Sequence, residues 1–339
     1  MMDIALDRAR VGERWVLRIR LADGSATDVI GWLVDLGADQ VVVEVSPVQQ
    51  VPVETAAVIL ARRAPAARGG PDPRRTSAED LERAALPGWV ALSEPLGDWT
   101  LRAGGGFTGR ANSALAVGDP GLPLDEAAER VVAYARRHGI APWAQVIVGS
   151  AMEAGLVERG WHPTYVVTDV LVCRLVTLLG DDLPDPRVTV DEDLDDAWLT
   201  AYGRSRPGSV SPAILRMILA GHPPRAFAAV PDPAGRVEPV AIARGHVSGP
   251  WLGIASVWTE PDHRRRGLAT AMMRALGHWA ARQEARQAYL QVAQENTGAH
   301  DAYARLGFAV HHSYRYLAAP DQPSGADQPS GTDQPSGTA

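Results

Sequence analysis

Three consecutive arginines followed by a glycine are the residues of this sequence best suited to binding a charged ligand. Arg264, Arg265 and Arg266 precede Gly267, and they follow an apolar run at residues 251–258. Beyond the glycine, apolar residues recur at intervals of three and four, which predicts a helix with one buried stripe. The first N–H groups of a helix lack intrahelical partners and carry partial positive charge. The stretch therefore predicts a pyrophosphate site between a strand and a helix.

A second segment, residues 296–308, has an amide side chain just before a predicted helix at residues 298–306 and a phenol on that helix. A glycine follows the helix and ends it. Asn296 precedes Tyr303 by two helical turns, about 10.5 Å along the axis. Both side chains therefore face one side and can touch different points of an extended ligand. A tyrosine hydroxyl can act as a general acid. Core packing by Tyr303 and helix capping by Asn296 are the structural alternatives.

Together the two motifs resemble the GNAT superfamily, the acyl-CoA-dependent N-acyltransferases. The cofactor loop of that family reads Arg/Gln-x-x-Gly-x-Gly/Ala, and Arg264, Gly267 and Ala269 match it. Residues 296–308 match its second motif, Asn-x-x-Ala-x-x-(Leu)-Tyr-x-x-x-Gly-Phe, with Ala302 in place of a larger residue. Two motifs in the right order, separated by a helix and a strand, are more specific than the loop alone.

The resemblance covers about residues 189–317 and implies a site for acetyl-CoA without a metal. It implies that the fourth and fifth strands splay apart and that backbone N–H groups at Val257, Trp258 and Thr259 hold the acyl carbonyl. It also implies Tyr303 as the general acid that protonates the leaving thiolate. The cofactor-binding residues implied are Val257, Trp258, Thr259, Arg264, Arg265, Arg266, Gly267, Leu268, Ala269, Thr270 and Asn296.

The general base is the least determined of the catalytic groups. Glu260 follows the central predicted strand and His246 lies on the strand before it, so either can take a proton directly or through water. An ion pair between Glu260 and an arginine is the structural alternative. His263, His311 and His312 lack metal-ligand spacing with acidic or cysteine partners, so surface or strand positions are expected for them.

Composition narrows the class of protein. The formal net charge of −7 over 339 residues argues against nucleic-acid binding as the main function. No apolar run has the length of a membrane span, and the start of the sequence lacks a signal-peptide core. A cytoplasmic protein is expected. The single cysteine, Cys173, lies in an apolar strand pattern and is interpreted as a buried structural thiol.

Residues 76–179 follow the same order of predicted elements as the C-terminal part of the chain, but their loop differs. Where the arginines stand in the C-terminal part, this segment has Asp119, Asp125 and Glu126. Carboxylates at a helix start repel a phosphate and compete for its N–H groups, so this segment is not expected to bind acyl-CoA.

The predicted fold class is α+β: two GNAT-like units in tandem, each a mixed and mostly antiparallel sheet flanked by helices, behind a small N-terminal β-barrel. Short alternating strands over residues 11–63 favour a barrel of SH3-like type. With this barrel the chain resembles an actinobacterial tandem-GNAT family. The expected domains are 1–64 (barrel), 65–75 (linker), 76–179 (degenerate GNAT-like unit), 180–319 (catalytic GNAT unit) and 320–339 (disordered tail).

The expected activity is transfer of acetyl from acetyl-CoA to a primary amine by direct attack. The acceptor is either a small metabolite or a protein amine, and the barrel is a candidate docking site for the latter. Two alternatives stay open. One is a non-catalytic acyl-CoA sensor or assembly protein. The other is an RNA or chromatin binder acting through the barrel, which the net charge disfavours.

Overall fold

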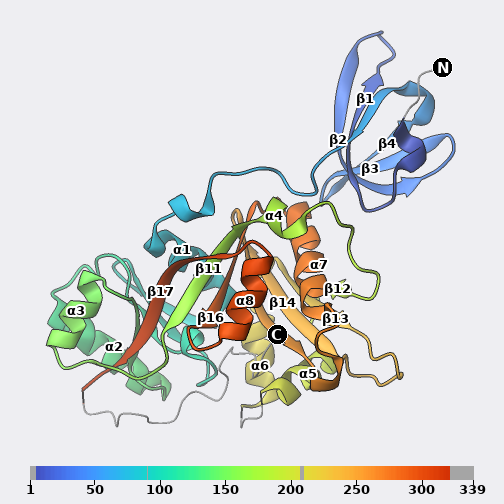
Figure 1. The fold of residues 1–339 in the computed structure, drawn as a ribbon. Coiled ribbons are helices and arrows are strands. Elements are labelled where there is room, and N and C mark those ends of the chain that lie inside the picture. Colours follow the sequence, from blue (N-terminus) through green and yellow to red (C-terminus); the bar gives the residue numbers. More distant parts are fainter. Residues whose placement is uncertain (1–4, 90, 207–209, 321–339) are drawn as a thin grey trace.

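The computed structural model describes residues 5–89, 91–206 and 210–320, and these form two separate sheets (Figure 1). A five-stranded sheet stands apart at the N-terminal end, and a twelve-stranded sheet runs through the rest of the molecule. The helices α2 (Leu124–His138) and α3 (Ala151–Glu158) lie near one end of the large sheet, and α7 (Leu268–Arg282) lies near the other.

The N-terminal sheet is antiparallel, with the strand order β4-β3-β2-β1-β5. Alternation along the strands places Trp15, Leu17 and Leu33 in a small apolar core. The sequence predicts a closed barrel here, whereas the structure has an open sheet with β4 and β5 as its two edges. Its elements are η1 (Ala5–Arg8), β1 (Arg14–Arg20), β2 (Ala26–Leu36), β3 (Gln40–Ser46), β4 (Gln49–Glu54), η2 (Thr55–Ala57) and β5 (Val58–Arg63).

The middle segment, residues 76–179, follows a Pro/Gly-rich connection. Its first helix begins after Ser77, whose hydroxyl accepts a hydrogen bond from the Asp80 N–H at 3.0 Å. Besides α2 and α3, the elements from this connection onward are η3 (Pro73–Arg75), α1 (Ala78–Ala85), η4 (Leu86–Gly88), β6 (Leu92–Leu96), β7 (Trp99–Ala103), η5 (Gly109–Ala111), β8 (Ala114–Leu115), β9 (Trp143–Ile147), β10 (His162–Pro163), β11 (Thr168–Arg174) and α4 (Leu175–Leu179).

The C-terminal segment, residues 180–319, supplies the other strands and helices of the large sheet. Helix α7 begins where the apolar stripe predicts, and Leu268, Met272 and Leu276 are buried along it. The remaining elements are β12 (Thr189–Asp191), α5 (Asp196–Ser205), α6 (Pro212–Leu219), β13 (Arg225–Val230), β14 (Ala241–Ser248), β15 (Trp251–Thr259), η6 (Pro261–His263), β16 (Gln287–Ala293), α8 (Thr297–Arg305) and β17 (Ala309–Ala318). The tail predicted at 320–339 lies, after Pro320, outside the described residues.

The two segments share strands within the large sheet. Its order is β12-β13-β14-β15-β16-β11-β17-β9-β8-β7-β6, with β10 also paired to β17. Strand β11 of the middle segment therefore lies between β16 and β17 of the C-terminal segment, as Figure 1 shows. Strand β17 then continues past β11 and pairs with β9. The middle and C-terminal segments are thus joined by continuous backbone hydrogen bonding.

The two faces of the large sheet carry different cores. On one face, α4, α7 and α8 pack on small and aliphatic strand residues such as Ala226, Leu252 and Leu290. On the other face, α5 and α6 pack with Trp89 and Phe107 of the middle segment. Trp198 and Tyr202 stack there, with ring centroids 5.5 Å apart. The end of β15 lies between these two cores.

Candidate active site

The backbone of β15 is irregular near its end. Pairing with β14 shifts register between Ile242 and Arg244, so Ala243 faces two residues of β15. This is a β-bulge, and Ser256 within it has a left-handed φ of 56°. Pairing between β15 and β16 covers only Trp251–Gln287 through Ile254–Leu290. The two parallel strands separate beyond that point, which leaves backbone groups of β15 available to a ligand.

A cavity of about 430 Å³ lies where the two strands separate. Strand β15, the loop after it, the first turns of α7 and one side of α8 form its walls. It brings together most of the residues that the sequence predicts as a site: Val257, Trp258, Thr259, Arg264, Arg265, Gly267, Leu268, Ala269, Thr270, Asn296 and Tyr303. Two predicted residues, Arg266 and Glu260, are not among those that line it.

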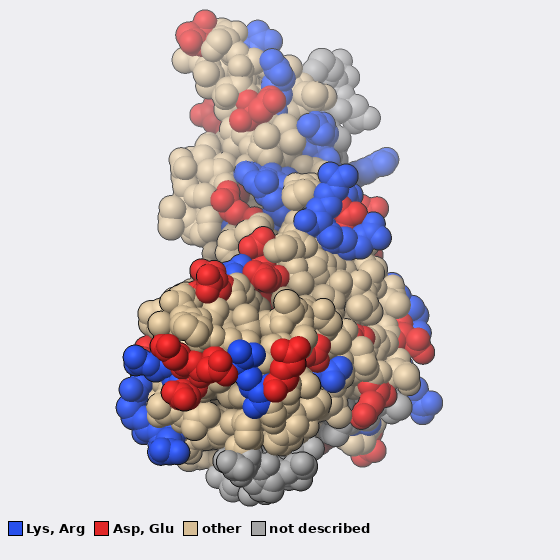
Figure 2. All heavy atoms as spheres, turned by 90° about the vertical axis from the view of Figure 1, so that its left-hand side faces the viewer, with Lys and Arg blue, Asp and Glu red and all other residues tan. Residues whose placement is uncertain are grey.

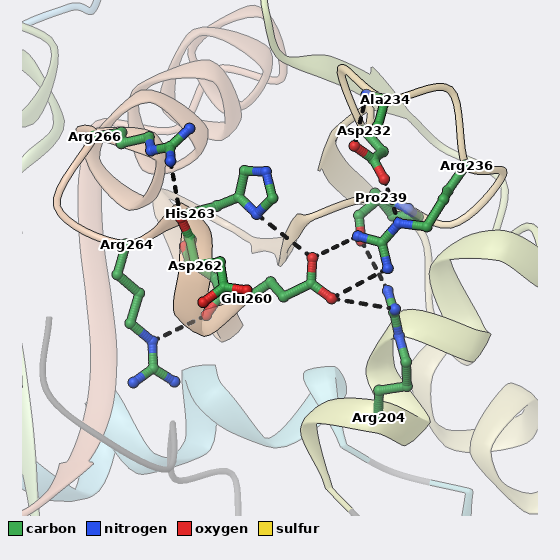
Figure 3. A network of polar contacts seen from close by, with 11 residues as sticks. Arg204, Asp232, Ala234, Arg236, Pro239, Glu260, Asp262, His263, Arg264 and Arg266 are labelled. Atoms are coloured by element: carbon green, nitrogen blue, oxygen red, sulfur yellow. Dashed lines mark hydrogen bonds and ion pairs between the residues drawn. The ribbon is translucent and has the colours of Figure 1, made fainter.

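The start of α7 forms one end of the cavity. Gly267 occupies the cap position with a left-handed φ of 76°. Because glycine has no side chain, the cap position supplies no hydrogen bond to the first N–H groups of the helix. Arg265 also has a left-handed φ, 59°. Arg264 Nε donates to the Thr259 carbonyl at 3.1 Å, which ties the loop to the end of β15 (Figure 3). An anion at this end would meet helix N–H groups and guanidinium charge together.

Arg266 holds the loop from behind instead of lining the cavity. Its Nη2 donates to the Asp262 carbonyl at 2.9 Å (Figure 3). The corresponding helix of the middle segment, α2, has Asp125 and Glu126 in its first turn, and Asp125 pairs with Arg159 at 2.7 Å. That helix start is therefore acidic where the start of α7 is basic.

Helix α8 forms the opposite wall along its length, from Asn296 to Leu306. The Asn296 side chain accepts a hydrogen bond from the Ala299 N–H at 3.1 Å, so it caps the helix as well as lining the cavity. The Tyr303 side chain is 8% exposed and packs edge to face on Phe308, with ring centroids 6.1 Å apart. Asn296 therefore caps the helix and Tyr303 packs on the core, as the structural alternatives predicted, and both residues also line the cavity.

Glu260 lies in a cluster of cations at the end of β15 (Figure 3). Arg236 Nη2 donates to its carboxylate at 2.5 Å, and Arg204 and His263 Nδ1 lie at 3.4 and 3.5 Å. The hydrogen bond from Arg236 is the largest cause that lowers the pKa of Glu260 below its usual value. A carboxylate with a lowered pKa is a weak proton acceptor near neutral pH.

His246, the other candidate base, lies inside the core. It is 3% exposed, and its Nε2 is 2.8 Å from the Tyr289 hydroxyl. Burial, followed by the nearby charge of Arg244, lowers the pKa of His246 to about 3. It is not among the residues that line the cavity.

Several cavity residues were not predicted from the sequence. They are His263, Met273, Ala299, Ala302, Arg305 and Leu306. Ala299 lies three residues after Asn296 and four before Tyr303, and Leu306 lies three after Tyr303, so the helical period could have identified these two. The bulge at Ser256 has no comparable local signal, since its register depends on a neighbouring strand.

Residues 5–89, 91–206 and 210–320 contain neither a metal-binding cluster nor a helix suited to a membrane. In these ranges no group of three or more His, Cys, Asp or Glu side chains is arranged to hold a metal ion. None of the helices in these ranges combines the length and the apolar character needed to cross a bilayer.

Comparisons with known proteins identify the family of the chain. A family profile described as "Probable histone acetyltransferase Rv0428c C-terminal" matches residues 76–317. "Probable histone acetyltransferase Rv0428c" of Mycobacterium tuberculosis is 27% identical over 328 residues, which cover 91% of this chain and 95% of that protein. "Uncharacterized N-acetyltransferase YobR" of Bacillus subtilis is 24% identical over 249 residues, covering 69% of this chain and 96% of that protein.

The fold agrees with a solved structure as well. A GCN5-related N-acetyltransferase from Kribbella flavida superposes with a TM-score of 0.54 at 18% identity, and the match covers 73% of this chain and 97% of that one. The shared fold, a mixed sheet flanked by helices, confirms the predicted α+β class for the GNAT part of the molecule. The profile match spans the middle and C-terminal segments together, and by it the chain belongs to the family of the Rv0428c C-terminal region and is an acetyltransferase of the GNAT type.

Proposed function

We propose that the protein transfers an acetyl group from acetyl-CoA to a primary amine by direct attack. The observation that carries this proposal is the position of the cavity, which extends from the separated strands to the start of α7. The start of α7 and Arg265 suit a pyrophosphate. The backbone of Val257, Trp258 and Thr259 suits an extended amide-containing arm, which needs main-chain partners.

In the proposed reaction the amine nitrogen attacks the thioester carbonyl carbon, a C–N bond forms and the C–S bond breaks. A backbone N–H at the bulge of β15 polarises the carbonyl oxygen. The Tyr303 hydroxyl gives its proton to the departing sulfur, and the proton that the amine nitrogen loses passes through water to the Tyr303 oxygen, which restores the hydroxyl. The single cysteine supports direct attack, because Cys173 is buried in the core and burial raises the pKa of its thiol, so it supplies no reactive thiolate.

For Glu260 we propose a positioning role. Its ion pairs with Arg236 and Arg204 connect the end of β15 to neighbouring elements, and its lowered pKa suits a fixed counter-charge better than a base. The sequence-based prediction of Glu260 as the base is tested by Glu260→Gln. If Glu260 is the base, Glu260→Gln should remove the acidic limb of turnover, the fall in rate at low pH where the base becomes protonated, whereas a uniform change across pH would support positioning.

For the acceptor we propose a protein amine, such as a lysine of a basic protein, since the M. tuberculosis relative is named a probable histone acetyltransferase. The N-terminal sheet, predicted as an SH3-like module, is the proposed docking element. It is held on α7: Trp32 lies under Arg282 at 5.3 Å, and Glu44 pairs with Arg282 at 3.6 Å. Figure 2 shows basic and acidic side chains together on this sheet, which does not favour nucleic acid.

A thiol-release assay tests the proposal. The full-length protein is incubated with acetyl-CoA and either histone-type basic peptides or a panel of small amines, and free coenzyme A is measured. We expect release that depends on a peptide acceptor. Release with small amines alone would overturn the choice of acceptor. Binding of acetyl-CoA by calorimetry with no release for any acceptor would favour the non-catalytic sensor.

A further inference from the structure

Asp169 is a buried acid in the strand that the middle segment contributes to the C-terminal segment. It lies on β11, directly opposite Val292 of β16 and Ser313 of β17, and it is 7% exposed. Leu171 and Cys173 follow at alternate positions and belong to the apolar core under α7 and α8. Asp169 is thus a charged residue on a strand face that is otherwise apolar, and such burial is costly unless partners surround the charge.

The partners of Asp169 all belong to the C-terminal segment, in and around α8. Gln294 Nε2, in the turn between β16 and α8, donates to Oδ1 at 2.7 Å. The Ser313 hydroxyl of β17 donates to the same oxygen at 2.6 Å. His300, in the first turns of α8, brings its buried Nε2 within 3.7 Å of Oδ2. One carboxylate therefore contacts the turn before α8, α8 itself and the neighbouring strand.

This arrangement links the rotation of α8 to β11 through one direct contact, the 3.7 Å approach of His300 Nε2 to Oδ2, while the hydrogen bonds come from Gln294 before α8 and Ser313 after it. His300 faces β11, whereas Ala299 and Tyr303 line the cavity. Residues three and four apart share a helix side, so the orientation of His300 and that of Tyr303 are linked. Charge-assisted hydrogen bonds in a buried site are short and directional, and they restrict their partners more tightly than apolar contacts do.

We propose that Asp169 is a positioning residue through which the middle segment sets α8, and with it Tyr303 and the cavity wall. This inference rests on the proposed function for its catalytic part and gives the degenerate unit a role in the reaction. Asp169 acts through α8 and is not itself in the cavity wall.

The test compares Asp169→Ala and Asp169→Asn with the control Val172→Ala. Val172 lies on the same strand and is equally buried, but it packs in a different core cluster from the one that contains α8. Asparagine keeps an oxygen for the Gln294 and Ser313 donors, whereas alanine removes every contact. For Asp169→Ala we expect kcat to fall about tenfold and the dissociation constant of coenzyme A to rise, since small misplacement of a catalytic group is costly. Asp169→Asn should retain most activity, and Val172→Ala should lower the melting temperature alone.

A double-mutant cycle with Tyr303→Phe separates positioning from general loss of stability. In the Asp169→Ala background, Tyr303→Phe should lower kcat by a smaller factor than in the wild type, because Tyr303 is already misplaced. Additive effects, or equal changes in kcat for Asp169→Ala and Val172→Ala, would overturn the proposal. If the wild type shows no turnover, the proposed function fails. Calorimetric coenzyme A affinity then decides: weaker binding in Asp169→Ala than in Val172→Ala supports the positioning role, and equal binding overturns it.

Discussion

At the scale of single residues, the structure assigns different tasks to neighbours that the sequence groups together. Arg264 and Arg265 line the cavity, whereas Arg266 turns back to the Asp262 carbonyl. The three side chains are chemically the same. Their different directions therefore come from the backbone, which is left-handed at Arg265 and turns again after it. We propose that a guanidinium in the cavity wall contributes to anion binding directly, and that one behind the loop contributes only by holding the loop in place.

The arginines are therefore expected to differ in their effect on cofactor affinity. Arg265→Ala should raise the apparent KM for acetyl-CoA about tenfold, equivalent to ~1.4 kcal/mol for one charge-assisted contact. Arg266→Ala should have a smaller effect. Initial-rate kinetics at varied acetyl-CoA measure both. Arg130 is exposed on α2, and Arg130→Ala serves as the control for the loss of one positive charge. Equal effects of Arg265→Ala and Arg266→Ala would show that the loop binds by net charge and not by geometry.

Tyr303 provides a second prediction at this scale. Tyr303→Phe keeps the edge-to-face contact with Phe308 and removes only the hydroxyl. Turnover should fall by about a hundredfold with cofactor affinity unchanged, because a general acid acts in the chemical step. Single-turnover kinetics and coenzyme A titration measure the two quantities separately. Unchanged turnover would leave Tyr303 as a packing residue.

Glu260 makes the stability of the protein depend on acid pH. Its pKa in the folded state is lowered, so its ion pairs stabilise the fold above the ordinary carboxyl pKa, near about 4.3. That contribution is lost as the pH falls through the lower, folded-state pKa. The stability advantage of the wild type over Glu260→Gln should therefore be constant near neutrality and shrink below about pH 4. Chemical denaturation at a series of pH values measures it. In an Arg236→Ala background the pH dependence should largely disappear, and an advantage that persists unchanged to about pH 3 would contradict this assignment.

At the scale of elements, two irregularities build the site: the bulge in β15 and the glycine at the start of α7. The bulge turns backbone groups of β15 out of the sheet. Because β15 and β16 separate there, β16 does not pair with these groups. Gly267 permits the left-handed turn from which α7 starts without a capping side chain. An acidic or hydroxyl cap there would compete for the same N–H groups that the site needs.

Gly267→Ala tests the second of these irregularities. A Cβ at Gly267 meets no heavy atom within 4 Å, so the cost comes from the left-handed φ of 76° and not from collision. We expect a loss of about 1 kcal/mol in stability and weaker coenzyme A binding. Gly203→Ala in α5 is the matched control, since a Cβ there also meets nothing within 4 Å and no left-handed φ is present. Thermal unfolding and calorimetry measure both variants. Similar outcomes at the two glycines would argue that backbone strain at α7 is unimportant.

At the scale of the whole molecule, the exchange of strands makes the middle and C-terminal segments one folding unit. Without β11, strands β16 and β17 would lose the partner that lies between them. Without β17, strand β9 of the middle segment would be exposed in turn. Unpaired strand edges favour aggregation. The N-terminal sheet, in contrast, has its own core and contacts α7 through side chains.

Truncations therefore have different expected outcomes. A fragment of residues 180–320 should not unfold cooperatively, because it lacks β11, whereas residues 65–320 should retain cooperative unfolding and coenzyme A binding. Circular dichroism melting and calorimetry of the two fragments measure these properties. Cooperative unfolding of residues 180–320 would show that the shared strand is dispensable.

The sequence by itself determined the elements with local causes. The helical period predicted α7 and α8, which the structure confirms. The acidic residues before and at the start of α2 distinguished the middle segment, and the anion site at the start of α7 stays a prediction from glycine and arginine chemistry. These features depend on neighbours within a few residues, so they can be read along the chain. The open form of the N-terminal sheet, the bulge at Ser256, the pairing of Glu260 with Arg236 and the exchange of β11 depend on contacts between distant segments. Only the tertiary structure decided them, because strand register and buried charge pairing are set by the partner across the sheet and not by the residues alongside in sequence.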